Sequence, residues 1–140
     1  MSKDTSQMLQ ELKNCSDFKR FYKENEYDIK DTTVSEYLKK LIEEKGLKRS
    51  EIIKKAEMSE VYAYQIISGV RIPEREKLLC LAFGMGLDLE ETQKLLKSTG
   101  YSQLYVRIPF DCIVIYGICN HLGVVEINEL LYEYGEDTLG

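Results

Sequence analysis

The sequence lacks the features that mark membrane and exported proteins. Its 140 residues contain no apolar run of about 18, the length that a membrane-spanning helix needs. The N-terminal stretch MSKDTSQMLQ has no apolar segment of the kind found in signal peptides. These two absences predict a cytoplasmic protein. A hydrophobic content of 44% over this length is enough for a folded core.

The sequence also lacks the patterns of common catalytic and metal sites. No CxxC pair occurs, His121 is the only histidine, and there is no glycine-rich phosphate loop. A zinc site needs closely spaced ligand pairs, so we expect the cysteines to be buried small apolar residues in a reducing compartment. No acid–base–nucleophile pattern surrounds His121, which lies where a helix should end. We therefore expect no enzyme activity, no metal and no cofactor. The cysteines are Cys15, Cys80, Cys112 and Cys119.

Positive charge is scarce and unevenly distributed. The chain carries a net charge of -5. Residues 34–73 hold 8 basic and 6 acidic side chains, whereas residues 101–140 hold 1 basic and 6 acidic ones. A stand-alone non-specific nucleic-acid-binding protein would be far more basic. The acidic C-terminal segment is a candidate surface for a protein partner.

Apolar periodicity predicts an all-α protein in three parts. Residues 1–33 form an N-terminal helical arm, with a helix over 1–25 capped by Asp4 or Thr5 and a polar linker after it. Residues 34–100 form a five-helix core, and residues 101–140 an acidic helical hairpin. The core helices are expected at Val34 to Gly46 (capped by Thr33 or Ser35), Ser50 to Ala56, Ser59 to Ser68, from Glu74, and Asp88 to Leu96.

The core is organised around two short helices joined by a tight break at Glu57-Met58-Ser59. So short a link makes the helices cross steeply, with Met58 filling the space between them. Ser59 caps the second helix and Gly69 ends it. We expect Ala63, Ile66 and Met58 to be buried and Glu60 and Gln65 to be exposed.

This stretch resembles the Cro and phage-repressor type of helix-turn-helix, the XRE family. The resemblance rests on Leu47, Lys48-Arg49, Ser50-Glu51-Ile52-Ile53, the turn Met58-Ser59, Gly69 and the segment LLCLAFGMG from Leu78 to Gly86. It implies a lambda-repressor-like bundle and a prokaryotic, sequence-specific DNA-binding transcriptional regulator that binds double-stranded DNA.

The resemblance also implies which residues meet DNA, because the second helix of such a motif enters the major groove. Base contacts fall on Glu60, Val61 and Gln65, where Gln65 suits adenine, Glu60 suits the cytosine amino group and Val61 suits the thymine methyl group. Phosphate contacts fall on Lys48, Arg49, Ser59, Tyr62 and Arg71, and Lys54 and Lys55 could add to them. Alternatively, Tyr62 packs over the neighbouring helix.

Two departures leave a second function open. The expected recognition helix, residues 59–68, has no lysine or arginine, and Glu60 stands at its start. Phosphate neutralisation supplies most non-specific affinity for DNA, and few cations are present here. The alternative is therefore a non-enzymatic adaptor or antitoxin-like module that binds a protein through the same fold.

The C-terminal half contains an internal repeat. Arg71-Ile72-Pro73 recurs as Arg107-Ile108-Pro109, and residues 78–104 align with residues 113–139 at a shift of 35. Each copy predicts a helical hairpin that needs a neighbour to bury its apolar face. The helix expected from Phe110 to Leu122 is apolar nearly all round, so we expect the segment from Phe110 to Tyr134 to take part in a homodimer. Alternatively, residues 1–25 fold back over the hairpin.

Overall fold

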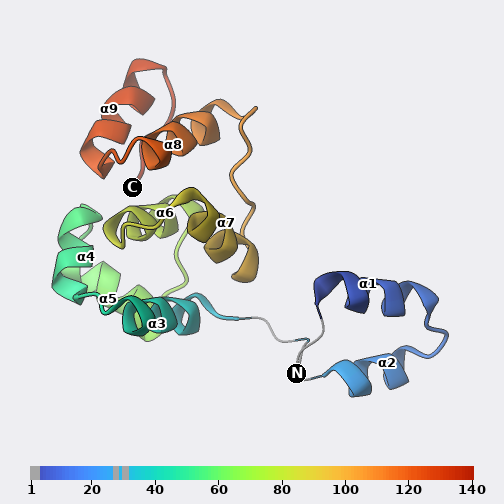
Figure 1. Cartoon of the computed structure of the whole chain (residues 1–140). Helices are drawn as coiled ribbons and strands as arrows, with labels where there is room; N and C mark the ends of the chain where they lie inside the picture. Colours follow the sequence, from blue (N-terminus) through green and yellow to red (C-terminus); the bar gives the residue numbers. More distant parts are fainter. Residues whose placement is uncertain (1–3, 27–28, 30–31) are drawn as a thin grey trace. The chain divides into compact units, whose positions relative to one another are not determined.

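The protein is all-helical in the part that the structure describes. The structure is a computed structural model that describes residues 4–26, 29 and 32–140. These residues form two compact units, Met1–Asp31 and Thr32–Gly140, and each is considered separately (Figure 1). The helices are α1 (Thr5–Asn14), α2 (Phe18–Asn25), α3 (Val34–Lys45), α4 (Arg49–Lys55), α5 (Glu60–Ser68), α6 (Arg75–Gly84), α7 (Leu89–Ser98), α8 (Pro109–Cys119) and α9 (Val124–Glu133).

The prediction of one helix over residues 1–25 is wrong, because the chain forms two helices there. Helix α1 ends at Asn14, and Cys15 has an extended backbone. Asp17 then starts α2, and its side chain accepts a hydrogen bond from the Arg20 N–H. Aspartate is unfavourable inside a helix but favoured at the N-cap, where its carboxylate accepts a hydrogen bond from a free backbone N–H. A second helix therefore starts here. The predicted cap Asp4 is confirmed. Part of the predicted linker, at residues 27–28 and 30–31, lies outside the described residues.

The larger unit begins with three helices around the predicted break. Thr33 caps α3 by accepting the Glu36 N–H, while Ser35, the other candidate, donates to the Ile67 carbonyl 2.6 Å away. Gly46 ends α3 in the left-handed conformation (φ 60°), as predicted. Helix α3 packs against α5 and α4 packs against α6. The apolar faces of these helices share one core with those of the following hairpins.

Helices α6–α7 and α8–α9 form two hairpins, and α6–α7 lies between the first three helices and α8–α9 (Figure 1). Their backbone hydrogen bonds recur at the predicted shift of 35. The Leu87 N–H bonds the Ala82 carbonyl at 3.1 Å, and the Leu122 N–H bonds the Gly117 carbonyl at 2.9 Å. Gly86 and His121 occupy the same left-handed position, with φ of 67° and 57°. His121 therefore follows the end of a helix, as expected.

Side-chain hydrogen bonds confirm the repeat independently. In the first hairpin, the Gln93 side chain accepts from the Leu104 N–H at 2.7 Å and donates to the Leu104 carbonyl at 2.8 Å. In the second, Asn128 accepts from the Leu139 N–H at 2.7 Å and donates to the Leu139 carbonyl at 3.4 Å. The repeated Arg-Ile-Pro sequence is the exception. Pro109 is the first residue of α8, whereas Pro73 precedes the N-cap of α6, so the two prolines are not equivalent.

A buried ion pair joins the two hairpins. Asp111 at the start of α8 is 1% exposed, and Arg75 at the start of α6 binds both its carboxylate oxygens at 2.9 and 3.0 Å. The same guanidinium donates to the carbonyls of Ser102 and Gln103 in the connecting segment. The Tyr105 N–H donates to Asp111 at 2.9 Å. One arginine thus fixes the second hairpin and its connection to the first.

The cysteines behave differently from one another. Cys80 is buried, and burial raises the pKa of its thiol to about 11. The expectation that all four are buried is wrong for Cys15, which is half-buried, and for Cys112 and Cys119, which are exposed on α8. This outer face of α8 is apolar in sequence but uncovered by other described residues of the larger unit. No described helix is long and apolar enough to cross a membrane.

Candidate nucleic-acid interface

The candidate interface is built on α4, the break and α5. Ile52, Ile53 and Ala56 of α4 are buried, and so are the inward residues of α5. Among the latter, Ala63 and Ile66 are fully buried, as predicted. Ser59 caps α5 by accepting the Tyr62 N–H at 3.1 Å, and Gly69 ends the helix with φ 90°. Both helices are therefore anchored on one side and leave the other side to solvent.

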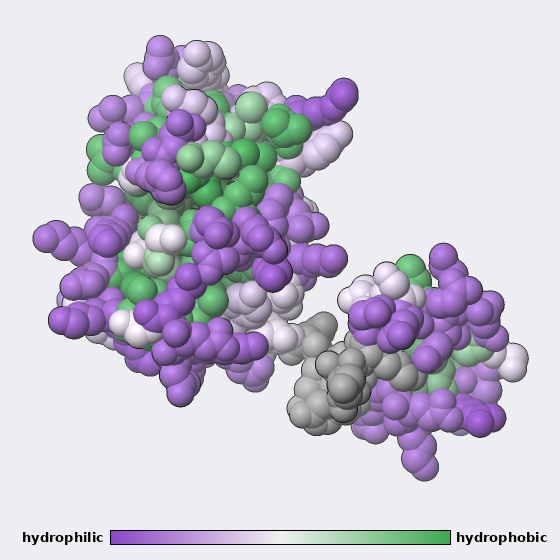
Figure 2. Space-filling model, viewed as in Figure 1, coloured by the Kyte–Doolittle hydropathy of each residue, from purple (hydrophilic) through white to green (hydrophobic). Residues whose placement is uncertain are grey.

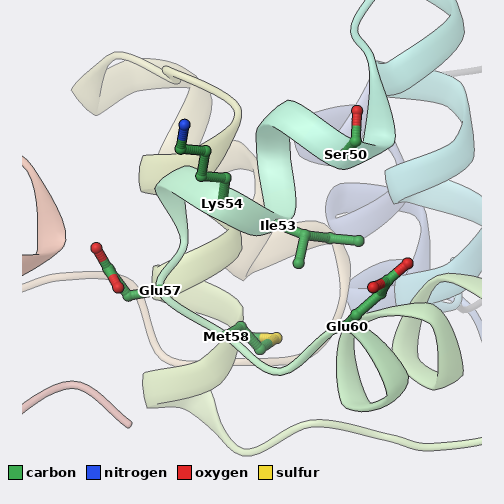
Figure 3. A pocket seen from close by; sticks show the side chains of 6 residues that line it. All are labelled: Ser50, Ile53, Lys54, Glu57, Met58 and Glu60. Atoms are coloured by element: carbon green, nitrogen blue, oxygen red, sulfur yellow. The ribbon is translucent and has the colours of Figure 1, made fainter.

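The break itself is held by the backbone and by Met58. Glu57 takes a left-handed conformation (φ 54°) after α4, and the Met58 N–H bonds the Ile53 carbonyl. Figure 3 shows Met58 between the end of α4 and the start of α5, beside a pocket that Ile53 and Glu60 also line. Met58 is half-buried and packs against the core, so it fills the space between the helices less completely than expected.

The outward face of α5 and the start of α4 meet in one shallow depression. Its lining includes the three predicted base-contacting residues Glu60, Val61 and Gln65, together with Arg49. Tyr64 and Ser68 complete it. Val61 is 69% exposed, and Glu60 and Arg49 are exposed as well. An arginine from the preceding helix thus lies beside the acceptor, apolar and amide groups of α5.

The expectation that Gln65 is exposed is wrong, because its side chain is half-buried and hydrogen-bonded, although at the surface rather than in the core. Its side-chain oxygen accepts from Arg71 Nε at 3.0 Å, and its backbone carbonyl accepts the Arg71 N–H. An amide oxygen has two lone pairs, so this bond leaves one acceptor position and both amide hydrogens of Gln65 available. Arg71, itself an exposed residue, therefore orients Gln65. No local sequence pattern indicates this pairing, because Gln65 and Arg71 are six residues apart and a helix end lies between them.

Tyr62 lies on the side of α5 that faces α6. Its ring has the Arg71 guanidinium at 5.0 Å and the Lys77 ammonium at 5.5 Å from its centroid, distances typical of cation–π contacts. Burial raises the pKa of the Tyr101 hydroxyl, and the charge of Tyr62 raises it further. Tyr62 thus packs over the neighbouring helix, the alternative considered for it, and its phosphate contact stays a prediction. Lys77 is a cation near this face that sequence reasoning missed.

The remaining predicted residues lie around the same face. Lys48 is exposed at the N-cap of α4, where its side chain makes no capping bond. The Ser59 hydroxyl is engaged as a cap, so a phosphate at this end would meet free backbone N–H groups of α5. Lys54 and Lys55 are exposed at the end of α4. The described residues contain no group of three or more histidine, cysteine, aspartate or glutamate side chains that could hold a metal ion.

Comparison with known proteins adds no relative to this description. No protein-family model, curated protein or solved structure matches the chain. We therefore infer the function from the residues of this interface alone.

Proposed function

We propose that the protein is a sequence-specific DNA-binding transcriptional regulator with a lambda-repressor-like helix-turn-helix of the XRE type. The observation that carries the proposal is the single depression that Arg49 shares with Glu60, Val61 and Gln65. A helix that binds in the major groove needs a cation for the phosphates and, beside it, side chains that can contact base edges. Arg49 is such a cation, and Glu60, Val61 and Gln65 are such side chains. As such a regulator, the protein would act in the cytoplasm of a prokaryote.

Each residue then has a defined role. Gln65, oriented by Arg71, binds the edge of an adenine, which offers one donor and one acceptor in the major groove. Val61 contacts a thymine methyl group and Glu60 accepts from a cytosine amino group. Lys48, Arg49 and Arg71 bind phosphates, and these contacts fix the position of α5 without reading sequence. In this arrangement Glu60 contributes specificity, because a carboxylate near DNA is tolerated only opposite a base donor.

Two copies on a palindromic site would compensate for the scarcity of cations. One helix-turn-helix contacts only a half-site, and two copies placed one helical turn apart double the number of phosphate contacts. A second candidate function is a protein-interaction module that uses the same face. It is favoured by the absence of lysine and arginine from residues 59–68.

The test compares Arg49→Ala with Gln65→Ala on a preferred DNA site and on random DNA. Loss of one phosphate contact should weaken binding to both DNAs alike and lower the salt slope by about one. Loss of the adenine contact should relax the preference at one base pair by about 1–3 kcal/mol and leave random DNA nearly unaffected. Tyr105→Ala, an exposed residue of the larger unit far from this face in sequence, is the control. Equal losses for both variants on both DNAs would refute the assigned roles.

A further inference from the structure

The second hairpin has an open apolar groove between its helices. The groove has a volume of about 740 Å³ and is lined by residues of α8, α9 and the segments that follow them, among them Ile113 and Tyr116 of α8, Leu122 of the turn, Leu130 of α9 and Tyr134 just after α9. Tyr116 is 54% exposed and Tyr134 is 69% exposed. In the view of Figure 2, hydrophobic surface gathers over this hairpin. Exposed apolar surface of this kind marks an interaction site more often than chance would give.

The internal repeat shows what covers such a face. At the shift of 35, Ile113, Tyr116 and Leu130 correspond to Leu78, Leu81 and Leu95 of the first hairpin, which are at most 1% exposed. Helices α4 and α5 lie against that side of α6. Gly84 of α6 is so close to α4 that an added Cβ would lie 2.4 Å from the Ile52 carbonyl oxygen, and Lys77 of α6 contacts the Tyr62 ring of α5.

A helix therefore covers this face in the first hairpin, and the described part of Thr32–Gly140 provides none for the second. The covering helix α4 also indicates which residues a helix on the second hairpin would carry. It presents Ile52 and Ile53 inward and carries Arg49, Lys54 and Lys55 on its exposed surface. Cys119 occupies the position equivalent to Gly84, so a helix on the second hairpin would lie farther out than α4 does.

The charge around the groove selects among possible occupants. Residues 108–140 contain six acidic residues and no lysine or arginine. Asp111 is paired with Arg75, but in the described structure Glu129, Glu133, Glu136 and Asp137 form no ion pair. Pairing two copies through this face would bring two acidic surfaces together, whereas a basic helix would neutralise one.

We propose that the groove between α8 and α9 binds an amphipathic α-helix of a partner protein, with apolar residues on the buried face and lysine or arginine along its edges. The apolar anchors would enter between Tyr116, Leu130 and Tyr134, as helix-in-groove partners do at i, i+3, i+4 and i+7. Glu133, Glu136 and Asp137 would meet the cations at the rim. This surface is separate from the α4–α5 face, so the proposal stands whether or not the protein binds DNA.

The test is a selection of random 18-residue peptides, displayed on phage, on the immobilised full-length protein. Peptides are kept when they bind the wild type and are lost with Tyr116→Ala and Tyr134→Ala. Both tyrosines are largely exposed, so these variants should fold, which circular dichroism checks. Tyr132→Ala is the matched control, because Tyr132 of α9 is 81% exposed, lies two residues from Tyr134 and does not line the groove.

The proposal predicts that the retained peptides share apolar residues at helical spacing and an excess of lysine and arginine. Their affinity for the full-length protein, measured by fluorescence anisotropy, should fall about tenfold or more with Tyr116→Ala and less than about twofold with Tyr132→Ala. Replacement of their basic residues by glutamate should cost a similar factor and remove the salt dependence.

Three results would overturn the proposal. The first is a selection that yields no peptide dependent on the two tyrosines, or only acidic or non-helical ones. The second is a full-length protein that sediments as a dimer at tens of micromolar and becomes monomeric with Tyr116→Ala, which makes a second copy the occupant. The third is peptide binding that appears only when Phe18 and Tyr22 are replaced by alanine, which makes the chain's own N-terminal segment the occupant.

Discussion

Replacement of Arg75 by alanine should be among the most destabilising changes outside the apolar core. The substitution leaves the Asp111 carboxylate buried, with the Tyr105 N–H as the remaining hydrogen-bond donor that the structure shows. Breaking a buried ion pair from one side typically costs about 3–5 kcal/mol. The Arg75 side chain is 22% exposed, so water can partly replace the guanidinium, which favours the lower end. The carbonyls of Ser102 and Gln103 also lose a donor, but they lie near solvent.

We therefore expect Arg75→Ala to lower the free energy of unfolding by about 3 kcal/mol, a large part of the roughly 5–15 kcal/mol of a typical domain. Urea unfolding followed by far-ultraviolet circular dichroism measures this loss as a midpoint lowered by about 1.5 M when the slope is about 2 kcal/mol/M. Arg107→Ala is the control, because Arg107 is exposed and should change stability by less than about 0.5 kcal/mol.

Replacing both partners by apolar residues tests whether the loss in Arg75→Ala comes from the unpaired charge of Asp111. The double variant Arg75→Met, Asp111→Leu removes both charges, so it should lose less stability than Arg75→Ala alone. If the free energies of unfolding of Arg75→Ala and Arg107→Ala differed by less than about 0.5 kcal/mol, the buried Asp111 carboxylate would not depend on Arg75, and this role of the pair would be wrong.

Three further changes test the packing of the larger unit. Gly84→Ala should lower the free energy of unfolding by about 1–3 kcal/mol, because its Cβ would collide with a backbone oxygen of α4. Cys119→Ala, at the equivalent exposed position of the second hairpin, should be nearly neutral in the same urea experiment. Gln93→Ala should cost about 1–3 kcal/mol by thermal unfolding, because both polar groups of the Leu104 backbone lose their partner, and no loss would contradict this role. A hydrogen bond from Lys45 of α3 lowers the pKa of Glu91 below its ordinary 4.5, so this ion pair stabilises the fold above that pH, and the contribution is lost as the pH falls through the lowered pKa. The free energies of unfolding of Glu91→Gln and wild type should therefore differ at pH 7 and converge on acidification below pH 4.5, and a difference that does not change with pH would contradict the assignment.

Local sequence signals predicted the elements of the larger unit well. The caps at Thr33 and Ser59 and the helix ends at Gly46 and Gly69 follow from side-chain chemistry and from the left-handed conformation that glycine adopts easily. The hairpin repeat was also visible, because periodic apolar residues recur at one shift. Its Arg-Ile-Pro match was misleading, since proline is favoured both before a helix and at its first residue.

Features that depend on tertiary contacts were not predictable. The break at Cys15–Asp17 is different, because its cause, the Asp17 cap, is local, and apolar periodicity alone does not divide the helical pattern there. The Arg75–Asp111 pair joins residues 36 positions apart, and the Gln65–Arg71 bond crosses a helix end. At the candidate interface, sequence reasoning identified the exposed Glu60 and Val61 of α5 and gave the packing of Tyr62 over the neighbouring helix as an alternative. It did not identify the hydrogen bond by which Arg71 holds Gln65. Both pairings are set by the angle at which the helices cross.

The measurement that tests DNA binding most directly is a selection of random double-stranded oligonucleotides on the full-length protein, followed by sequencing. If α5 reads bases, the selected pool should converge on one motif, and Gln65→Ala should relax a single position of that motif. A palindromic motif with half-sites about 10 base pairs apart would agree with two bound copies. A pool that stays random after repeated rounds at about 50 mM salt, where phosphate contacts are strong, would contradict the account and favour a protein partner for this face.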